Sequence, residues 1–394
     1  MSGRRIAVTG MGLRTSNADS PESYAEALSA GRSGVREITR FDTGWPFRLG
    51  GEVTLAPEEE EPGLDRVSQL AVAAARQAVA DSGLSPSVLE HARAGLCLGT
   101  SRGPALSLER LLRPGEHDDK QALFAEVPFS SIARNVARRL GLSGPIATVT
   151  MACVSSSLAI GRAWDMVRRG QADAMIAGGA DSLTRLSFSG FSVLRAMTKS
   201  SCRPFDRRRD GMILGEGAGF LVLEDFDHAR RRGARIYAEI CGWGTAGDAH
   251  HATSPHPQGR GLANAIRAAL RQAELPVDAI DHANLHGTGT QANDPAECQA
   301  IRQVFGASAA RLPVNSLKPM IGHTLGAAGV LELAGSLLGM RGGFVPPTLN
   351  YAEPDPSCAL NVVGNEPQEQ AIDALLSTKS AFGGANVAIV ARRV

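Results

Sequence analysis

A single cysteine stands where a predicted buried strand runs directly into a predicted helix. The apolar segment 146–151 is typical of a strand and the segment 154–169 of an amphipathic helix, so Cys153 lies at their junction. Unpaired backbone N–H groups and the positive end of the helix dipole favour a thiolate there, which predicts a lowered thiol pKa. The same N–H groups can hold an oxyanion. A buried structural cysteine is the simpler interpretation, so a catalytic role requires partners elsewhere in the chain.

Two histidines on loops rich in glycine are candidate partners. His286 ends a predicted strand and is followed by Gly-Thr-Gly-Thr, while His323 follows Gly322 and precedes the glycine- and alanine-rich helical segment 325–340. Lys318 lies five residues before the second histidine. Taken alone, each histidine could equally be a buried core residue with no catalytic role. Together with a cysteine at a helix start, the two fit a nucleophile that handles thioesters.

Other motifs in the chain give weaker signals. The segment 242–247 satisfies G-x-G-x-x-G, but the residues after it cannot start a helix, so a glycine-rich turn explains it better than a dinucleotide site. His250, His251 and His256 lie close to Asp248 and form a possible metal-binding loop. Packing and hydrogen bonding are the more common roles of such a loop, and we expect no metal.

Short apolar runs alternate with helical stretches, which predicts an α/β protein. Strands are expected at 5–9, 94–98, 146–151, 174–177, 219–223 and 238–242, and helices at 20–30, 65–82, 129–140, 154–169, 262–273, 295–304 and 325–340. The pattern restarts near Tyr237, and the tripeptide Arg-Gln-Ala at 76–78 recurs at 271–273. This weak echo suggests two similar halves, 1–235 and 236–394.

Composition and charge exclude several classes of protein. The 394 residues include 41 basic and 40 acidic side chains, so the chain cannot bind nucleic acid through bulk charge. The six cysteines are dispersed, which favours a reduced chain inside the cell. The first apolar run is too short for a signal peptide, and no apolar stretch is long enough to cross a membrane. We therefore expect a soluble cytoplasmic protein.

Short motifs follow one another along nearly the whole chain: 8–12, 27–34, 152–153 with the serines after it, 203–219, 286–290, 318–329 and 382–386. In this order they resemble the beta-ketoacyl-acyl carrier protein synthases, the decarboxylating condensing enzymes of the thiolase superfamily. The resemblance implies the thiolase fold, an α/β architecture of five layers, α/β/α/β/α, built from two similar halves.

The resemblance also implies a reaction, the decarboxylative Claisen condensation that gives a beta-ketoacyl-acyl carrier protein and CO2 in fatty acid or type II polyketide biosynthesis. Cys153 would take an acyl chain from a carrier-protein thioester. His286 and His323 would hydrogen-bond the malonyl thioester carbonyl and stabilise the enolate that forms as CO2 leaves. The backbone N–H groups of Cys153 and Phe382 would form the oxyanion hole, and the ring of Phe382 would act as a gate.

Further residues match supporting positions of the family. Lys318 resembles a buried lysine and Glu332 its carboxylate partner. Asp294 and Glu297 would join this network while also capping their own helix, with Asp294 at the N-cap and Pro295 at the first helical position.

Substrates would arrive on the phosphopantetheine arm of an acidic acyl carrier protein, with no further cofactor. Thr288 and Thr290 would line the path of that arm. Arginines of two clusters are candidate contacts for the carrier, although each cluster could equally be a solvated face: Arg134, Arg138, Arg207 and Arg208.

Three departures from the family pattern favour specialised biosynthesis. The segment 14–17 replaces a usual proline and glycine, the serines after Cys153 resemble polyketide-type synthases, and Ala381 replaces the glycine before Phe382.

Several alternatives remain open. The protein could act as a homodimer, as the active subunit of a heterodimer with a chain-length factor, or as a non-elongating thiolase-fold acyltransferase. A non-catalytic chain-length partner would typically lack the cysteine. A thiolase that uses coenzyme A would have a second catalytic cysteine near the C-terminus, where this chain has 382–386 instead.

Overall fold

The computed structural model describes residues 3–85, 89, 93–113 and 120–394. The strands of its main sheet are β1 (Ile6–Arg14), β4 (Ala94–Gly99), β5 (Ile146–Val149), β6 (Ala174–Asp181), β7 (Gly217–Asp225), β8 (Ala238–Gly247), β9 (His282–Asn284), β10 (Pro313–Asn315), β12 (Asn361–Val362), β14 (Ala374–Ser380) and β15 (Ala385–Arg392). Two small sheets pair β2 (Arg36–Glu37) with β3 (Leu49–Gly50), and β11 (Phe344–Val345) with β13 (Gln368–Glu369).

The described helices alternate with these strands. They are α1 (Pro21–Ser29), α2 (Arg66–Ser82), α4 (Ala105–Leu111), α5 (Lys120–Glu126), α6 (Ser130–Leu140), α7 (Ser155–Arg168), α8 (Arg185–Val193), α9 (Phe226–Arg231), α10 (Arg260–Ala273), α11 (Asn293–Phe305), α12 (Lys318–Ile321) and α13 (Ala328–Gly342). Within the described residues, no helix combines the length and the apolar character needed to cross a bilayer.

Strand topology repeats along the chain. In the described residues the main sheet has the order β12-β10-β9-β14-β15-β8-β1-β7-β6-β4-β5. Two sets of five strands, β5-β4-β6-β7-β1 and β10-β9-β14-β15-β8, are equivalent when their strands are counted in chain order from β1 and from β8. In each set the second strand along the chain lies between the third and the fourth, and the fifth lies beside the first. The two sets meet where β1 pairs antiparallel with β8. The fold is therefore built from two similar halves, while a division at residues 235 and 236 stays a prediction.

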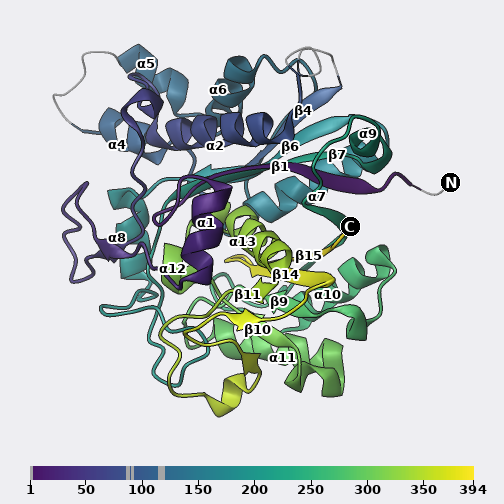
Figure 1. Ribbon diagram of the computed structural model, residues 1–394. Helices are drawn as coiled ribbons and strands as arrows, with labels where there is room; N and C mark the ends of the chain where they lie inside the picture. Colours follow the sequence, from purple (N-terminus) through teal and green to yellow (C-terminus); the bar gives the residue numbers. More distant parts are fainter. Residues whose placement is uncertain (1–2, 86–88, 90–92, 114–119) are drawn as a thin grey trace.

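Helices and strands are stacked in five layers (Figure 1). Helices α2 and α6 cover the outer face of the first set of strands, and α10 and α11 cover the outer face of the second set. Helices α7 and α13 lie between the two sets and contact strands of both. This α/β/α/β/α arrangement has the five layers that the resemblance implies.

Burial explains the composition of the central elements. Strands β1 and β6 are buried along their whole length because helices cover both faces of the sheet. Helix α13 is buried on every side from Ala328 to Met340, so it shows almost no amphipathic pattern. The predicted strands and helices all overlap observed ones. Helices α4, α5, α8, α9 and α12 were not predicted, and the four residues of α12 are too few to show a helical period.

Candidate active site

The backbone turns sharply just before the candidate nucleophile. Ala152 has φ +45°, a left-handed conformation that is costly for alanine, and α7 begins only three residues later. The Ser155 hydroxyl holds the turn, since its Oγ accepts from Met151 N at 2.8 Å and donates to the Ala152 carbonyl at 2.7 Å. Cys153 therefore lies at the strand-to-helix junction, as predicted, with 6 % of its surface exposed.

His286 is held from its backbone and from its ring. The N–H groups of His286 and Gly287 donate to the two carboxylate oxygens of Glu297 at 2.6 and 2.8 Å. Nδ1 of His286 lies 3.3 Å from Nζ of Lys318, which also donates to the His286 carbonyl. Because an ammonium can only donate, Nδ1 must accept. The ring proton of neutral His286 is therefore on Nε2.

His323 has the same tautomer for a different reason. Its backbone pairs with the segment 213–215, and Gly322 before it has φ +75°, a conformation that glycine adopts at low cost. The Leu325 N–H donates to Nδ1 of His323 at 3.3 Å, so the proton of the neutral ring is again on Nε2. The two imidazole rings lie 5.2 Å apart between centroids, at an interplanar angle of 82°.

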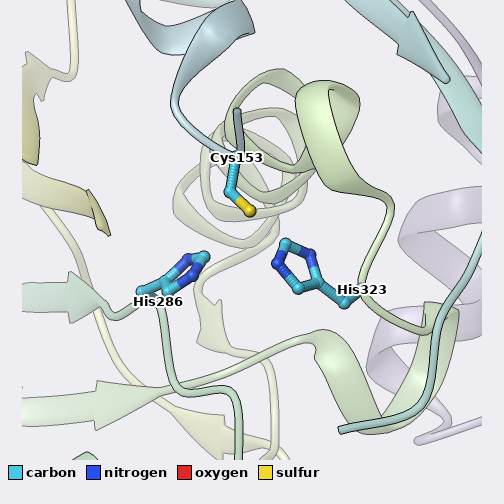
Figure 2. Close-up of side chains that lie close together, drawn as sticks. All are labelled: Cys153, His286 and His323. Carbon is cyan, nitrogen blue, oxygen red and sulfur yellow. The ribbon is translucent and has the colours of Figure 1, made fainter. Parts of the chain in front are cut away.

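The thiol and the two imidazoles converge although they come from distant segments (Figure 2). Sγ of Cys153 and one nitrogen from each of His286 and His323 all lie within 4.8 Å of one another. In principle such a group can chelate a soft metal ion. The Lys318 ammonium beside His286 disfavours a second positive charge there, so we assign these side chains no metal.

Burial lowers the pKa of both histidines well below the ordinary value of 6.5. The positive charge of Lys318 is the second cause for each ring, and the charge of Lys379 lowers both pKa values further. His286 and His323 are therefore neutral at pH 7, and each presents an Nε2–H donor.

The predicted lowering of the Cys153 pKa is wrong. Burial raises the pKa of this thiol to about 12, although the positive charge of Lys318 acts in the opposite direction. Desolvation penalises the thiolate because nearly all of the side chain is removed from water. The resting side chain is therefore a thiol, which must lose its proton as it reacts.

Lys318 and Glu332 form the expected buried pair, with Nζ 2.7 Å from Oε1. The sequence reasoning missed a second lysine, Lys379, whose Nζ lies 3.0 Å from Oε2 of the same carboxylate. This second contact is an ion pair, not a well-directed hydrogen bond. A lysine close behind the apolar residues 374–376 of β14 was the available signal, since a buried charge requires a partner.

Asp294 and Glu297 serve the histidine loop and not their own helix. Helix α11 begins at Asn293, its N-cap residue is Ala292 without a side-chain cap, and the predicted N-cap role of Asp294 is therefore wrong. The Asp294 carboxylate instead accepts from the backbone N–H groups of Thr288, Gly289 and Phe205 at 2.9 to 3.2 Å. The burial of both carboxylates raises their pKa values.

Asp181 is a second residue that the sequence reasoning missed. This buried carboxylate ends β6 and accepts hydrogen bonds from Thr100 Oγ1, from the backbone N–H groups of Ser101 and Arg102, and from Gly326 N at 2.6 Å. Burial raises its pKa to about 6. Asp181 thus ties the first half of the chain to the loop that follows His323.

A cavity of about 290 Å³ brings together the cysteine, both histidines, Thr288, Thr290 and Phe382. The hydroxyl oxygens of the two threonines lie 2.9 Å apart. The ring of Phe382 packs against Phe191, with centroids 5.8 Å apart. Within the described residues, the backbone N–H of Phe382 donates no hydrogen bond.

The histidine-rich loop lies beside this cavity. Asp248 lines it, whereas the rings of His250 and His256 pack together with centroids 5.2 Å apart. Nδ1 of His251 accepts from the backbone N–H groups of Thr253 and Ser254. These contacts agree with the packing and hydrogen-bonding interpretation of the loop.

The four candidate carrier-contact arginines are exposed, but two already have acidic partners. Arg134 pairs with Glu126 at 3.1 Å, and Arg208 pairs with Glu353 at 3.2 Å. Arg138 and Arg207 make no ion pair with any described residue. Sequence reasoning missed Arg195, an exposed cation that lines the cavity itself.

Comparison with known proteins places the chain in a family. Residues 3–229 match the family described as Beta-ketoacyl synthase, N-terminal domain, and residues 237–352 match Beta-ketoacyl synthase, C-terminal domain. The chain is 38 % identical to the tetracenomycin polyketide synthase ketoacyl synthase alpha subunit of Streptomyces glaucescens, over 99 % of this chain and 97 % of that protein. It is 37 % identical to 3-oxoacyl-[acyl-carrier-protein] synthase 2 of Coxiella burnetii, over the full length of both.

Solved structures agree with this placement. The ishigamide ketosynthase/chain length factor superposes with a TM-score of 0.94 at 38 % identity, over the full length of both chains. A type II polyketide synthase acyl-carrier protein complex with its hexaketide-bound ketosynthase gives a TM-score of 0.93 at 33 % identity, again over both full lengths. The chain therefore belongs to the beta-ketoacyl synthase family.

Proposed function

We propose that the protein condenses an acyl chain held on Cys153 with a malonyl group carried by acyl carrier protein, and releases CO2. The observation that carries this proposal is the cavity in which one thiol faces two neutral imidazoles, each with an Nε2–H donor. Two donors without a strong base suit a reaction in which decarboxylation itself generates the carbanion.

In the first step, the Cys153 sulfur attacks the thioester carbon of the incoming acyl chain. The thiol proton ends on the departing phosphopantetheine sulfur, so acyl transfer is balanced without a change in charge. The backbone N–H groups of Cys153 and Phe382 stabilise the oxyanion of the tetrahedral intermediate. Thr288 and Thr290 line the path of the phosphopantetheine arm.

In the second step, the bond between the malonyl carboxylate and its neighbouring carbon breaks, and CO2 leaves. The electron pair passes into the enolate of the thioester, whose oxygen accepts from Nε2–H of His286 and His323. The enolate carbon attacks the acyl carbon on Cys153, and the sulfur leaves as a thiolate that takes up one proton from water. The product is a beta-ketoacyl-acyl carrier protein.

The chemistry requires no resident cofactor, because the substrates bring their own thioester activation. Arg138 and Arg207 are free to meet an acidic carrier protein, while Arg134 and Arg208 would exchange their present partners for it. The dispersed cysteines and the thioester substrates support a cytoplasmic location.

A second, narrower function is supported by the polyketide relatives. The chain resembles the alpha subunit of one polyketide ketosynthase and the ketosynthase/chain length factor structure over its full length. With its nucleophile and histidines present, it fits the active subunit of such a heterodimer. Native mass spectrometry of the chain alone and with proteins encoded beside it distinguishes a homodimer from this assembly.

The variant Cys153→Ala tests the proposed reaction. Covalent loading from an acyl carrier protein should fall by at least about 10⁴-fold, because no other group in the cavity can form the thioester. Decarboxylation of malonyl carrier protein should persist, because the histidines that stabilise the enolate remain. Intact-protein mass and CO2 release measure the two activities.

Cys241→Ala is the matched control, since this half-buried thiol lies on β8 and does not line the cavity. It should load acyl chains at the native rate. Undiminished loading of the Cys153 variant would contradict the proposal.

A further inference from the structure

Lys379 is a buried charge that the proposed reaction steps leave unused. It lies on β14, and its side chain is fully buried. Its Nζ lies 2.7 Å from Asn284 Oδ1, 2.7 Å from the Thr378 carbonyl, 3.4 Å from Ser377 Oγ and 3.0 Å from Glu332 Oε2. A buried ammonium is costly unless it is paired, so each of these contacts helps to retain it in charged form.

Glu332 connects this lysine to the site. Its Oε1 is 2.7 Å from Nζ of Lys318, its Oε2 is 3.0 Å from Nζ of Lys379, and Lys318 lies 3.3 Å from Nδ1 of His286. Since one carboxylate binds both ammonium groups, the loss of one would let Glu332 and the remaining lysine shift. Lys379 is thus linked to the imidazole through two side chains.

The charges of Lys318, Glu332 and Lys379 do not cancel. Two ammonium groups share one carboxylate, so these three side chains together carry an excess positive charge, and both lysines act on the two imidazoles. The titratable and charged groups around the two rings are Cys153, Asp181, Asp294, Glu297, Lys318, Glu332 and Lys379, and the cavity lining adds Arg195, Asp210 and Asp248.

We propose that Lys379 is a second positioning lysine of this site, which acts through Glu332 to hold Lys318 against Nδ1 of His286. Its charge adds to that of Lys318 in disfavouring an imidazolium, so both rings keep the neutral form that donates from Nε2. The catalytic consequence rests on the proposed function, whereas the effect on the histidines does not. A lysine with only a structural role would leave the histidine titrations unchanged.

The variant Lys379→Met removes the charge and retains most of the side-chain volume. Full-length protein labelled with ¹³C at histidine Cε1 is titrated by NMR, with His286→Asn and His323→Asn variants for assignment. In the variant the pKa values of the two rings should rise by about one unit, as expected for the loss of a nearby like charge. Unchanged titrations overturn the proposal, and this measurement requires no substrate.

Two further variants keep the result interpretable. Ser377→Ala removes the 3.4 Å contact but no charge, so the histidine titrations should be unchanged. Lys379→Gln is a second neutral variant whose amide can still donate to Asn284, and it should give the same shift if Lys379→Met does not fold.

Activity gives the second readout. The reaction needs neutral rings, which donate from Nε2 while Nδ1 accepts. If the histidine pKa values rise in Lys379→Met, the rings become protonated at higher pH. The acid limb of the pH profile for malonyl carrier protein decarboxylation should therefore move to higher pH by the same amount, about one unit. Combined with Glu332→Gln, the rate losses should be less than multiplicative, since both act on Lys318. Multiplicative losses contradict action through Glu332. Shifted titrations in a protein that decarboxylates nothing would instead reject the proposed function alone.

Discussion

The protonation states of individual residues at this site depend more on burial than on position relative to a helix. Cys153 lies before α7, where the dipole favours a thiolate, yet desolvation raises its pKa to about 12. The same desolvation lowers the pKa of His286 and His323, because it penalises whichever form carries charge. The resting site therefore holds three neutral reacting groups beside the buried charges of Lys318, Glu332 and Lys379.

The pH dependence of Cys153 alkylation tests this balance. Thiolate is the reactive form, and with a raised pKa its fraction grows about tenfold for each pH unit. The rate of iodoacetamide modification should therefore rise about 100-fold from pH 7 to pH 9 without a plateau, as measured by mass spectrometry of the Cys153 peptide. The same peptide in urea should begin to level off near pH 9. A plateau below pH 8 in the native protein would mean that the helix start and Lys318 outweigh burial.

At the scale of elements, the contact between two central helices positions the nucleophile relative to His323. Helix α7 follows Cys153, and α13 follows the loop that carries His323. The two helices touch, and the Val330 N–H of α13 donates to Ser156 Oγ of α7 at 3.1 Å. A glycine permits this approach, because a Cβ at Gly329 would lie 2.1 Å from Ser157 Oγ and 2.9 Å from Ser157 N.

The variant Gly329→Ala should therefore separate α7 from α13. We expect a loss of about 1–3 kcal/mol in the free energy of unfolding, as for other overpacked cores, together with slower acyl loading of Cys153. Urea denaturation and intact-protein mass measure the two effects.

Gly190→Ala is the matched control, because it lies inside helix α8 and a Cβ there would meet its nearest neighbour at an ordinary 3.8 Å. This substitution should be neutral or stabilising by up to about 1 kcal/mol. Equal stability of the two variants would show that α7 and α13 can move without cost.

At the scale of the whole molecule, the two halves are equivalent but serve different purposes. The first supplies the thiol and the second supplies both histidines. The Arg-Gln-Ala echo falls in α2 and α10, each of which packs on the first strand of its half. The edge strand β5 is only partly buried, unlike the strands inside the main sheet, and its residue Ile146 is 48 % exposed. An edge strand with exposed apolar residues is a natural place for a second subunit.

The variant Ile146→Lys tests whether β5 meets that subunit. A buried lysine at such an interface should weaken the dimer by at least about tenfold, equivalent to about 1.4 kcal/mol. Native mass spectrometry across a dilution series measures the dissociation. Arg138→Ala, on the outer helix α6, should leave the dimer intact. An unchanged dimer in the Ile146 variant would place the interface elsewhere.

The sequence by itself determined the α/β alternation, the junction at Cys153, the glycine-rich histidine loops and hence the family, because these are local patterns or ordered motifs. Only the tertiary structure decided the protonation of the site and the partners of its buried charges. Those properties depend on groups far apart in the chain: Asp181 binds Gly326 across 145 residues, and Lys379 binds Asn284 across 95. Local periodicity contains no information about such distances, and burial, which outweighed the helix start at Cys153, exists only once the layers have packed.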